Sequence, residues 1–332
     1  MLAQRKTLKE AVAVLSFYSG NLLVKTMRSS KVDDHVYLID VETAGIKHFI
    51  ASYVLVGERV AIVETGPTSS VPNLLSGLRE LGVEPEEVAY VAVSHIHLDH
   101  AGGVGTLLHH LPNAQVVVHP KGAPHLAHPE KLWEQSKMVL GSMTDLYGAP
   151  EAVPEERIIA SADGMTLDIG NGVRLRVMET TGHASHHQSY YEPSCEGVFP
   201  GDAAGIYLND IDVIVPTTPA PFRMDIALAS LDKLRVLKPK SLFYSHFGKS
   251  SDALEKMHAY VRQLKLWARV AKQELDKGES LETISGRIVE SDVSLKRVLD
   301  YVRVHPVLGE TVLRNSVQGV VDFVAKFGAV PE

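Results

Sequence analysis

The sequence predicts an α+β fold in which strands and helices alternate and a helical extension follows. Up to residue 250, short apolar runs rich in β-branched residues alternate with segments of helical periodicity, which is typical of sheets covered by helices. Beyond residue 250 only helical patterns remain. Several of the β-branched runs end directly in histidine or aspartate, so the sequence places metal-ligating side chains at strand ends.

The predicted strands are short runs dominated by valine, isoleucine and aromatic residues. Gly57 and Glu58 form a short turn between two of them, so the chain should begin its sheet with a meander. The run that precedes Ser94 has no polar alternation and is expected to be buried. Strands are predicted at residues 35–41, 49–56, 59–64, 88–93, 115–119, 173–178 and 241–245.

The predicted helices carry apolar residues at helical spacing. Leu228, Leu231 and Leu234, for example, would form one buried face. Ser280 is placed to cap a helix N-terminus, and Glu282 would then lie in the first turn, where a negative charge suits the helix dipole. Helices are predicted at residues 68–82, 104–111, 130–147, 225–237, 251–277, 281–289, 292–304 and 307–327.

Composition limits the classes of function. The chain carries 33 basic and 40 acidic residues, a net charge of −7, and its lysines and arginines are interspersed. This pattern does not suit a nucleic-acid partner. Cys195 is the only cysteine, so no internal disulfide and no thiolate metal cluster can form, which favours a reducing, cytoplasmic location.

Residues 1–30 are predicted to form an N-terminal extension. Basic residues precede an apolar stretch at 11–18, as in a signal peptide, but no small-residue cleavage site follows it. The stretch is also too short to cross a bilayer. We therefore expect an added helix or an unstructured segment here, and no membrane partner.

The highest density of potential metal ligands lies in the ten residues 94–103. His95, His97, Asp99 and His100 follow a predicted strand directly, and two glycines then allow a tight turn. Imidazole and carboxylate ligands suit zinc, manganese or ferrous iron. Four such side chains exceed the need of one catalytic ion with an open position, so two ions about 3.5–4 Å apart use them better. The alternative is a polar loop that holds histidines without a metal.

Three later strand ends carry the same residue types. His183 follows a glycine at the end of the predicted strand 173–178, and Asp202 follows a glycine after a short apolar segment. His246 directly follows the predicted strand 241–245. Strand ends that share one edge of a fold could bring these side chains together with the cluster at 94–103.

Taken together, these residues resemble the metallo-β-lactamase superfamily. The segment His95-x-His97-x-Asp99-His100 is similar to the signature motif of that family. Gly182-His183 with His187-Gln188-Ser189 resembles a pattern common in its glyoxalase II-like and lactonase-like branch. The chain departs from the family at Glu64, where aspartate is usual, and at Thr181, which replaces a proline. The resemblance covers residues 31–250, the predicted catalytic domain.

The resemblance implies a four-layer αββα sandwich with two divalent metal ions at one edge, most often zinc, with iron or manganese as alternatives. A hydroxide held between the ions would be the nucleophile, and Asp99 would orient it and move a proton. Glu64 and His187 would orient ligands by hydrogen bonds. The implied ligands are His95, His97 and His183 for the first ion, Asp99, His100 and His246 for the second, and Asp202 as a bridge.

This ligand set favours a dinuclear hydrolase that acts on an ester, thioester or lactone of a small molecule. One alternative is a phosphodiester or phosphotriester hydrolase, although no long basic run marks a nucleic-acid groove. Another is an enzyme similar to persulfide dioxygenases, which share much of the motif and use one iron. A binding protein without catalytic activity is the last alternative.

Two loops, 120–150 and 205–225, are expected to decide which substrate fits. The resemblance to lactone hydrolases is weaker at Gly205, where those enzymes carry a tyrosine that touches the substrate. Residues 251–332 are expected to pack on the core, shape the pocket rim or mediate a homodimer. The predicted substrate contacts are Tyr207, Phe222 and Met224.

Overall fold

The computed structural model describes residues 27–304 and 310–328. The predicted N-terminal extension lies largely outside these ranges, and its last two residues belong to the first strand of a sheet. No helix within the described residues is both long and apolar enough to cross a membrane.

The first sheet has seven strands that lie side by side in chain order. Its first four strands are antiparallel, as the predicted meander requires, and its last four run parallel to one another. The strands are β1 (Ser29–Lys31), β2 (Val36–Asp40), β3 (Ala51–Val56), β4 (Val60–Val63), β5 (Val88–Ala92), β6 (Gln115–Val118) and β7 (Ile158–Ala160).

The second sheet has six strands in the order β15-β14-β11-β10-β9-β8. Its strands are β8 (Thr166–Gly170), β9 (Val173–Glu179), β10 (Gln188–Glu192), β11 (Gly197–Phe199), β14 (Ser241–Tyr244) and β15 (Gly248–Ser250). A separate two-stranded ribbon consists of β12 (Ile206–Leu208) and β13 (Val213–Val215).

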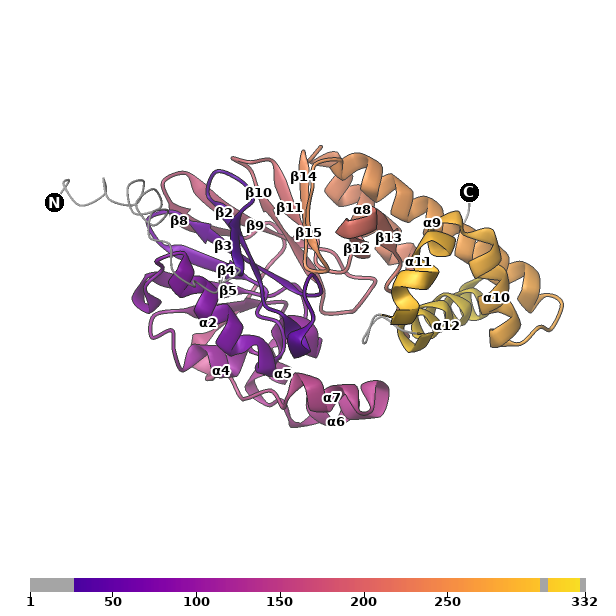
Figure 1. The fold of residues 1–332 in the computed structure, drawn as a ribbon, viewed down its shortest axis with the longest axis horizontal. Helices are drawn as coiled ribbons and strands as arrows, with labels where there is room; N and C mark the ends of the chain where they lie inside the picture. The colour runs from indigo at the N-terminus through magenta and orange to yellow at the C-terminus, as the bar shows by residue number, and fades with distance from the viewer. Residues whose placement is uncertain (1–26, 305–309, 329–332) are drawn as a thin grey trace, which may run out of the picture.

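Helices cover the outer faces of both sheets, so the layers run helix, sheet, sheet, helix (Figure 1). One group lies against the seven-stranded sheet, α8 and α9 lie on the other side, and α10 to α12 extend from α9. The helices are α2 (Val71–Glu80), α3 (Leu98–Ala101), α4 (Val104–Leu108), α5 (Ala123–Ala127), α6 (Glu130–Leu140), α7 (Met143–Tyr147), α8 (Met224–Val236), α9 (Ala253–Leu275), α10 (Leu281–Ser291), α11 (Val293–Val304) and α12 (Glu310–Phe327).

Strands β3 and β4 of the first sheet are apolar runs because both of their faces are buried. On β3, Tyr53 and Leu55 face a cluster between the two sheets, whereas Val54 faces the cluster under the helices. The hydroxyl of Tyr53 donates a 2.7 Å hydrogen bond to the carbonyl of Tyr244 on β14, which ties the two sheets together. The predicted four-layer αββα arrangement is thus confirmed.

One prediction about local structure is wrong, and one element was not predicted. Residues 130–147 form two helices rather than one, because Gly141 has a φ of 56°, which ends α6. The ribbon β12–β13 was not expected in the proline-rich segment 205–225. It fits there because all three prolines of that segment lie after β13.

The C-terminal helices pack on one another and on the segment that follows β13. The buried carboxylate of Asp292 accepts hydrogen bonds from Trp267 (2.8 Å) and Gln263 (3.0 Å) on α9. Ser280 caps α10 as predicted, since its hydroxyl accepts from the backbone N–H of Thr283 at 3.2 Å. The division of the chain at residue 250 and a homodimer stay predictions.

Candidate metal centre

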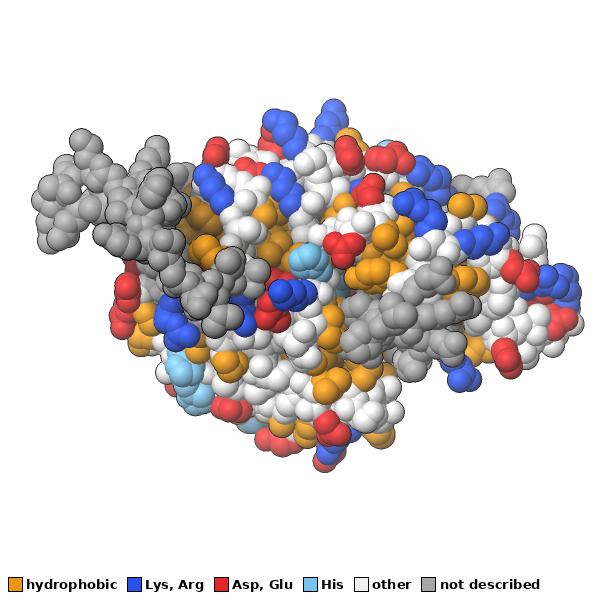
Figure 2. Space-filling view, in the orientation of Figure 1, with side chains coloured by type: hydrophobic (Ala, Val, Ile, Leu, Met, Phe, Trp, Pro, Cys, Tyr) orange, Lys and Arg blue, Asp and Glu red, His pale blue; other side chains and the backbone are white. Residues whose placement is uncertain are grey.

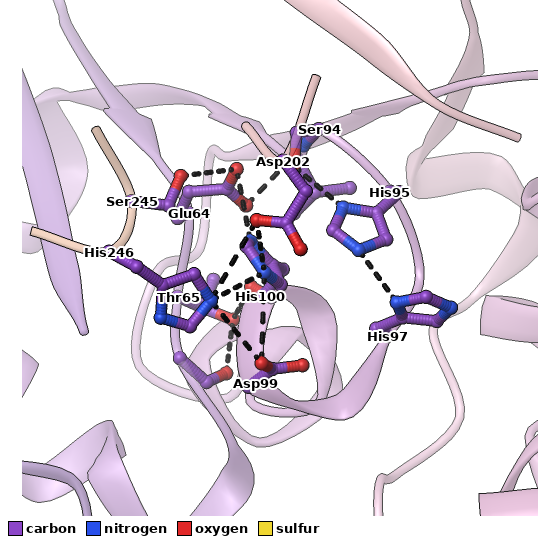
Figure 3. Close-up of polar contacts among 12 residues, drawn as sticks. Glu64, Thr65, Ser94, His95, His97, Asp99, His100, Asp202, Ser245 and His246 are labelled. Carbon is purple, nitrogen blue, oxygen red and sulfur yellow. Dashed lines mark hydrogen bonds and ion pairs between the residues drawn. The ribbon is translucent and has the colours of Figure 1, made fainter. Parts of the chain in front are cut away.

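The predicted ligands come from four places in the fold, each directly after a strand. β5 leads into the segment that carries His95 and His97 and then into α3 with Asp99 and His100. His183 follows β9, Asp202 follows β11, and His246 follows β14. Figure 3 shows side chains from three of these segments converging on one point between the sheets. The candidate ligands are therefore positioned by the ends of strands that meet at one edge of the fold.

The seven side chains form two groups joined by one carboxylate. In the first group, Nδ1 of His97 lies 2.8 Å from Nε2 of His95 and 3.3 Å from Nε2 of His183. In the second group, Nε2 of His246 lies 3.2 Å from Nε2 of His100 and 3.4 Å from a carboxylate oxygen of Asp99. Within each group the potential ligand atoms lie within 4.8 Å of one another.

Asp202 lies between the two groups. Its Oδ2 is 3.4 Å from Nε2 of His183, and its Oδ1 is 3.4 Å from Nε2 of His100. Each oxygen of the carboxylate therefore faces a different group. This is the arrangement that a bridging ligand requires.

Hydrogen bonds orient the imidazoles. Nδ1 of His183 lies 2.9 Å from the carbonyl oxygen of Thr217, and Nδ1 of His246 lies 3.1 Å from that of Phe49. A carbonyl can only accept, so the proton sits on Nδ1 and the lone pair of Nε2 points to the centre. Nδ1 of His95 similarly lies 2.9 Å from the hydroxyl of Ser94.

The protonation of the site suits a cation. Burial and the adjacent His183 lower the pKa of His97 to about 3, so its imidazole is neutral and able to ligate near neutral pH. His100 shows the opposite behaviour. Burial lowers its pKa, but the carboxylates of Asp202, Asp99 and Glu64 outweigh that effect and raise it to about 10. The negative charges of these carboxylates thus stabilise a positive charge at the position of His100.

The described residues supply no lysine or arginine for that positive charge, because all the ion-pair partners of Asp99 and Asp202 are histidines. Oδ1 of Asp202 and Nδ1 of His100 are buried without a hydrogen-bond partner. Imidazoles with inward lone pairs, two carboxylates and unmatched negative charge fit divalent metal ions. The structure contains groups able to hold such ions, and which metal they hold stays a prediction.

Glu64 and His187 lie where supporting residues would be needed. Oε1 of Glu64 is 3.5 Å from Nδ1 of His100, and Ser245 donates to the same oxygen at 3.2 Å. His187 acts on the backbone of a ligand rather than on a ligand side chain. Its Nε2 accepts from the backbone N–H of Asp202 at 3.1 Å, which fixes the position of the bridging carboxylate.

A cavity of about 930 Å³ opens above the centre. Its floor includes His97, Asp99 and Asp202, and its walls come from α6 and α7, the segment 181–186, and the segment 217–221. Among the carboxylates of the centre, Asp99 is the more open, with 24% of its side chain exposed against 5% for Asp202.

The predicted substrate contacts need correction, because none of the three lines this cavity. The hydroxyl of Tyr207 points away and donates to Asp212 at 2.8 Å, while Phe222 and Met224 are buried in the core. Their neighbours Pro221 and Arg223 line the cavity instead. Successive side chains of this segment point in opposite directions, so Pro221 and Arg223 face the cavity, whereas Phe222 and Met224 face the core.

Several cavity residues were not predicted as site residues. Lys121, Tyr147 and His186 all line the cavity. The first two lie in the loop region 120–150, which was expected to shape the pocket, but no motif marks individual residues there. His186 adjoins the motif that contains His183, and that proximity was the only available signal.

The profile of the metallo-beta-lactamase superfamily matches residues 46–246. The chain belongs to this superfamily. It is a metallohydrolase of that fold, as the resemblance at the strand ends implied. The match includes all seven predicted ligands.

Relatives agree with this assignment. The chain is 28% identical over 248 residues to the metallo-beta-lactamase fold-containing protein ST1585 of Sulfurisphaera tokodaii, covering 73% of this chain and 87% of the relative. It is 29% identical over 180 residues to an N-acyl homoserine lactonase of Bacillus sp., covering 52% of this chain and 62% of that enzyme.

A solved structure extends the likeness over nearly the whole fold. The metallo-beta-lactamase family protein TTHA1429 of Thermus thermophilus aligns with a TM-score of 0.65 and 20% identity, covering 91% of this chain and 96% of that one. At this identity the likeness concerns the fold alone.

Proposed function

We propose that this superfamily member is a dinuclear hydrolase that cleaves an ester, thioester or lactone of a small molecule. The observation that carries the proposal is the pair of three-residue groups that share Asp202, in each of which the potential ligand atoms lie within 4.8 Å of one another. The ions proposed are zinc, held by His95, His97 and His183 on one side and by Asp99, His100 and His246 on the other.

Two divalent ions in such a centre supply a hydroxide nucleophile at neutral pH and polarise the scissile carbonyl. The chain's own residues would do the rest. Histidines around Asp99 outweigh the effect of its burial and hold its pKa well below the usual range, so the carboxylate is ionised. Because it is also open to the cavity, Asp99 would orient the attacking hydroxide by a hydrogen bond and relay the proton that the hydroxide carries to the leaving oxygen or sulfur.

Carbonyl substrates are favoured over phosphoesters by the walls of the cavity. These are largely apolar, and a Bacillus N-acyl homoserine lactonase is among the relatives. The C-terminal helices contribute Asn315 and Ser316 to the lining, which supports their proposed role at the rim. The cytoplasmic location stays a prediction.

The test is to load purified protein with zinc, measure ions per chain, and assay a panel of lactones, thioesters, carboxylic esters and phosphoesters. We expect close to two ions and turnover of one of the carbonyl classes, lost on chelation and restored by zinc. Turnover of phosphoesters alone would contradict the proposed substrate class. A single iron with oxygen uptake on a persulfide would replace the hydrolase with the dioxygenase alternative.

A further inference from the structure

The cavity above the metal centre is chemically different on its two sides. On the side of the second ligand group, the ring of Phe49 lies 5.4 Å from that of His246. Tyr147 lies near Asp99, whose negative charge adds to the effect of burial in raising the pKa of the tyrosine. On the side of the first group, the ring of His186 lies 5.7 Å from that of His97. A substrate that spans both ions would touch both sides.

The side next to Phe49 is apolar. α7 carries Met143 and the buried Tyr147 of the lining and packs against residues 43–45, a few positions before Phe49. Leu140, three residues before Met143, also lines the cavity. Farther out, Met138 and Val139 are 78% and 62% exposed and also line the cavity. In Figure 2 the lower edge of the molecule, where α6 and α7 project, carries a few hydrophobic side chains among charged and other ones. Apolar surface that a protein leaves open in this way marks a binding site for an apolar group.

The side next to His186 is polar and carries one lysine, Lys121. Nδ1 of His186 is buried without a hydrogen-bond partner. Burial and the neighbouring His183, together with the nearby His119 and His125, lower the pKa of His186 to about 4, so its imidazole is neutral near pH 7. Lys121 and His125 line this part of the cavity, and the backbone N–H of Lys121 donates to His119 at 3.1 Å. Lys121 makes no ion pair with any residue that the structure describes.

Outside the proposed metal centre, the charged side chains that line the cavity have one sign. Apart from the metal ligands, the charged residues of the lining are Lys121 and Arg223, and no acidic residue joins them in the described part of the chain. Arg223 is already paired with Asp225 at 2.6 Å, which leaves Lys121 as the free cation among the described lining residues. In a chain of net charge −7, a described lining whose charges outside the proposed metal centre are both basic favours a negatively charged ligand.

We propose that the substrate is an anionic amphiphile, namely an acyl ester, thioester or lactone that also carries a carboxylate or another acidic group. Its acyl chain lies against Phe49 and the α6–α7 wall, and its acidic group lies against Lys121 and His186. This rests on the proposed function, because the two sides are defined by their positions over the two ligand groups. The unpaired Nδ1 of His186 gains a partner when the acidic group binds.

The experiment separates binding from hydrolysis. Zinc-loaded protein is titrated calorimetrically with N-acyl-β-alanines and with the matching neutral N-acyl-β-alaninamides, whose amide bond replaces the scissile ester. We expect the carboxylates to bind roughly three- to tenfold more tightly than the amides at low salt, with the difference shrinking at high salt. Lengthening the acyl chain should tighten both series by up to roughly fourfold per buried methylene.

Variants assign the preference to the proposed residues. Lys121→Gln should remove most of the preference for the carboxylate and leave affinity for the amide unchanged. Lys131→Gln is the matched control, since Lys131 is exposed and lies outside the lining. His186→Gln should keep part of the preference, because an amide can still donate a hydrogen bond, whereas His186→Phe should not.

The outcomes distinguish the two proposals. Equal affinity for carboxylate and amide, or no measurable binding of either, would overturn the anionic substrate. A preference that survives both Lys121→Gln and His186→Phe would also overturn it, because the carboxylate would then be bound by the metal ions. Preferential binding without turnover of any ester, thioester or lactone would instead reject the proposed hydrolase and retain the ligand class.

Discussion

At the scale of single residues, Asp202 has the position that a bridging ligand of the proposed two-ion centre requires. Among the described residues it is the carboxylate whose two oxygens face different ligand groups, and His187 fixes its backbone. Burial would raise its pKa, but the surrounding His100, His183 and His246 outweigh that effect and lower it. The carboxylate is therefore ionised and able to bridge two cations.

Replacing this carboxylate should uncouple the two metal sites. Asp202→Asn keeps the shape of the side chain and removes its charge, so we expect one of the two ions to be lost on dialysis and hydrolysis to fall by at least roughly a hundredfold. Metal analysis and initial rates on the same sample check this. Asp34→Asn, at a carboxylate that is 98% exposed, should retain both ions and full activity. Two retained ions in Asp202→Asn would argue against a bridging role.

Glu64 offers a finer test, because it contacts only one ligand of the second group. Glu64→Gln removes the negative charge beside Nδ1 of His100 but keeps an oxygen that can accept from Ser245. We expect affinity for one ion to fall roughly 10- to 100-fold while the other is unchanged. Competition with a chromophoric chelator would resolve the two steps. Equal weakening of both ions would show that Glu64 acts on the whole centre.

The seven residues that the sequence singled out as ligands lie together in the structure, because each combines a distinctive residue type with a strand end. Their role as ligands stays a prediction. The sequence did not predict Lys121, Tyr147 or His186 as cavity residues. Their inward direction depends on how α5, α7 and the segment after β9 are docked, and docking leaves no local pattern in the sequence. The wrong contacts at Phe222 and Met224 have the same cause, since their facing was set by packing against α8 and the core.

At the scale of secondary-structure elements, strand β10 shows why a strand of polar residues is difficult to predict from the sequence. Its residues Gln188 to Glu192 have no apolar alternation, yet four of the five are fully buried. The burial is possible because each polar group is bonded. Nε2 of Gln188 donates to the carbonyl of Val93 at 3.1 Å, and Ser189 donates to that of Pro200 at 3.1 Å. These partners come from distant segments, so no local pattern in the sequence indicates them.

The turn between β10 and β11 is held by a buried carboxylate, and this makes stability depend on pH. Burial raises the pKa of Glu192, but hydrogen bonds from His35, Ser194 and the backbone of Cys195 outweigh it and lower the pKa to about 2. A lowered folded-state pKa contributes stability above the unfolded value of about 4.5. That contribution is lost as the pH falls from 4.5 toward 2.

We therefore expect Glu192→Gln to destabilise the fold by about 3 kcal/mol at pH 7 and by much less near pH 2.5. Urea unfolding at a series of pH values would measure both. Glu86→Gln, at an exposed glutamate whose side chain makes no hydrogen bond or ion pair among the described residues, should change stability little at any pH. A loss of stability in Glu192→Gln that is constant with pH would mean that packing, and not charge, stabilises the turn.

At the scale of the whole molecule, the C-terminal helices are connected to the site through α12. The hydroxyl of Thr218 donates to the carbonyl of Ser316 at 2.6 Å, and the segment around Thr218 also supplies the carbonyl that orients His183. The family resemblance predicted the four layers but left open whether residues 251–332 pack on the core or serve a dimer. Contacts between distant segments decide such packing, and helical periodicity alone does not encode them.

Gly319 provides the test of this connection. It lies on α12 against the carbonyl of Thr218, and a Cβ at this position would overlap that oxygen. Gly286, on α10, is also helical, but a Cβ there would meet no atom within 4 Å. Gly286→Ala should stabilise the protein by roughly 0.5–1 kcal/mol through helix propensity. Gly319→Ala should destabilise it by about 1–3 kcal/mol, because α12 must shift to relieve the overlap.

If α12 is tied to the cavity, this shift should also reach the substrate site. Gly319→Ala should then raise KM for the best carbonyl substrate while the metal content stays at the wild-type value, since none of the seven predicted ligands lies on α12. Gly286→Ala should leave KM unchanged and so separates a local effect from a general one. Equal stability of the two variants would show that α12 is loosely held. A destabilised Gly319→Ala with unaltered KM would show that the helix supports the fold without shaping the cavity.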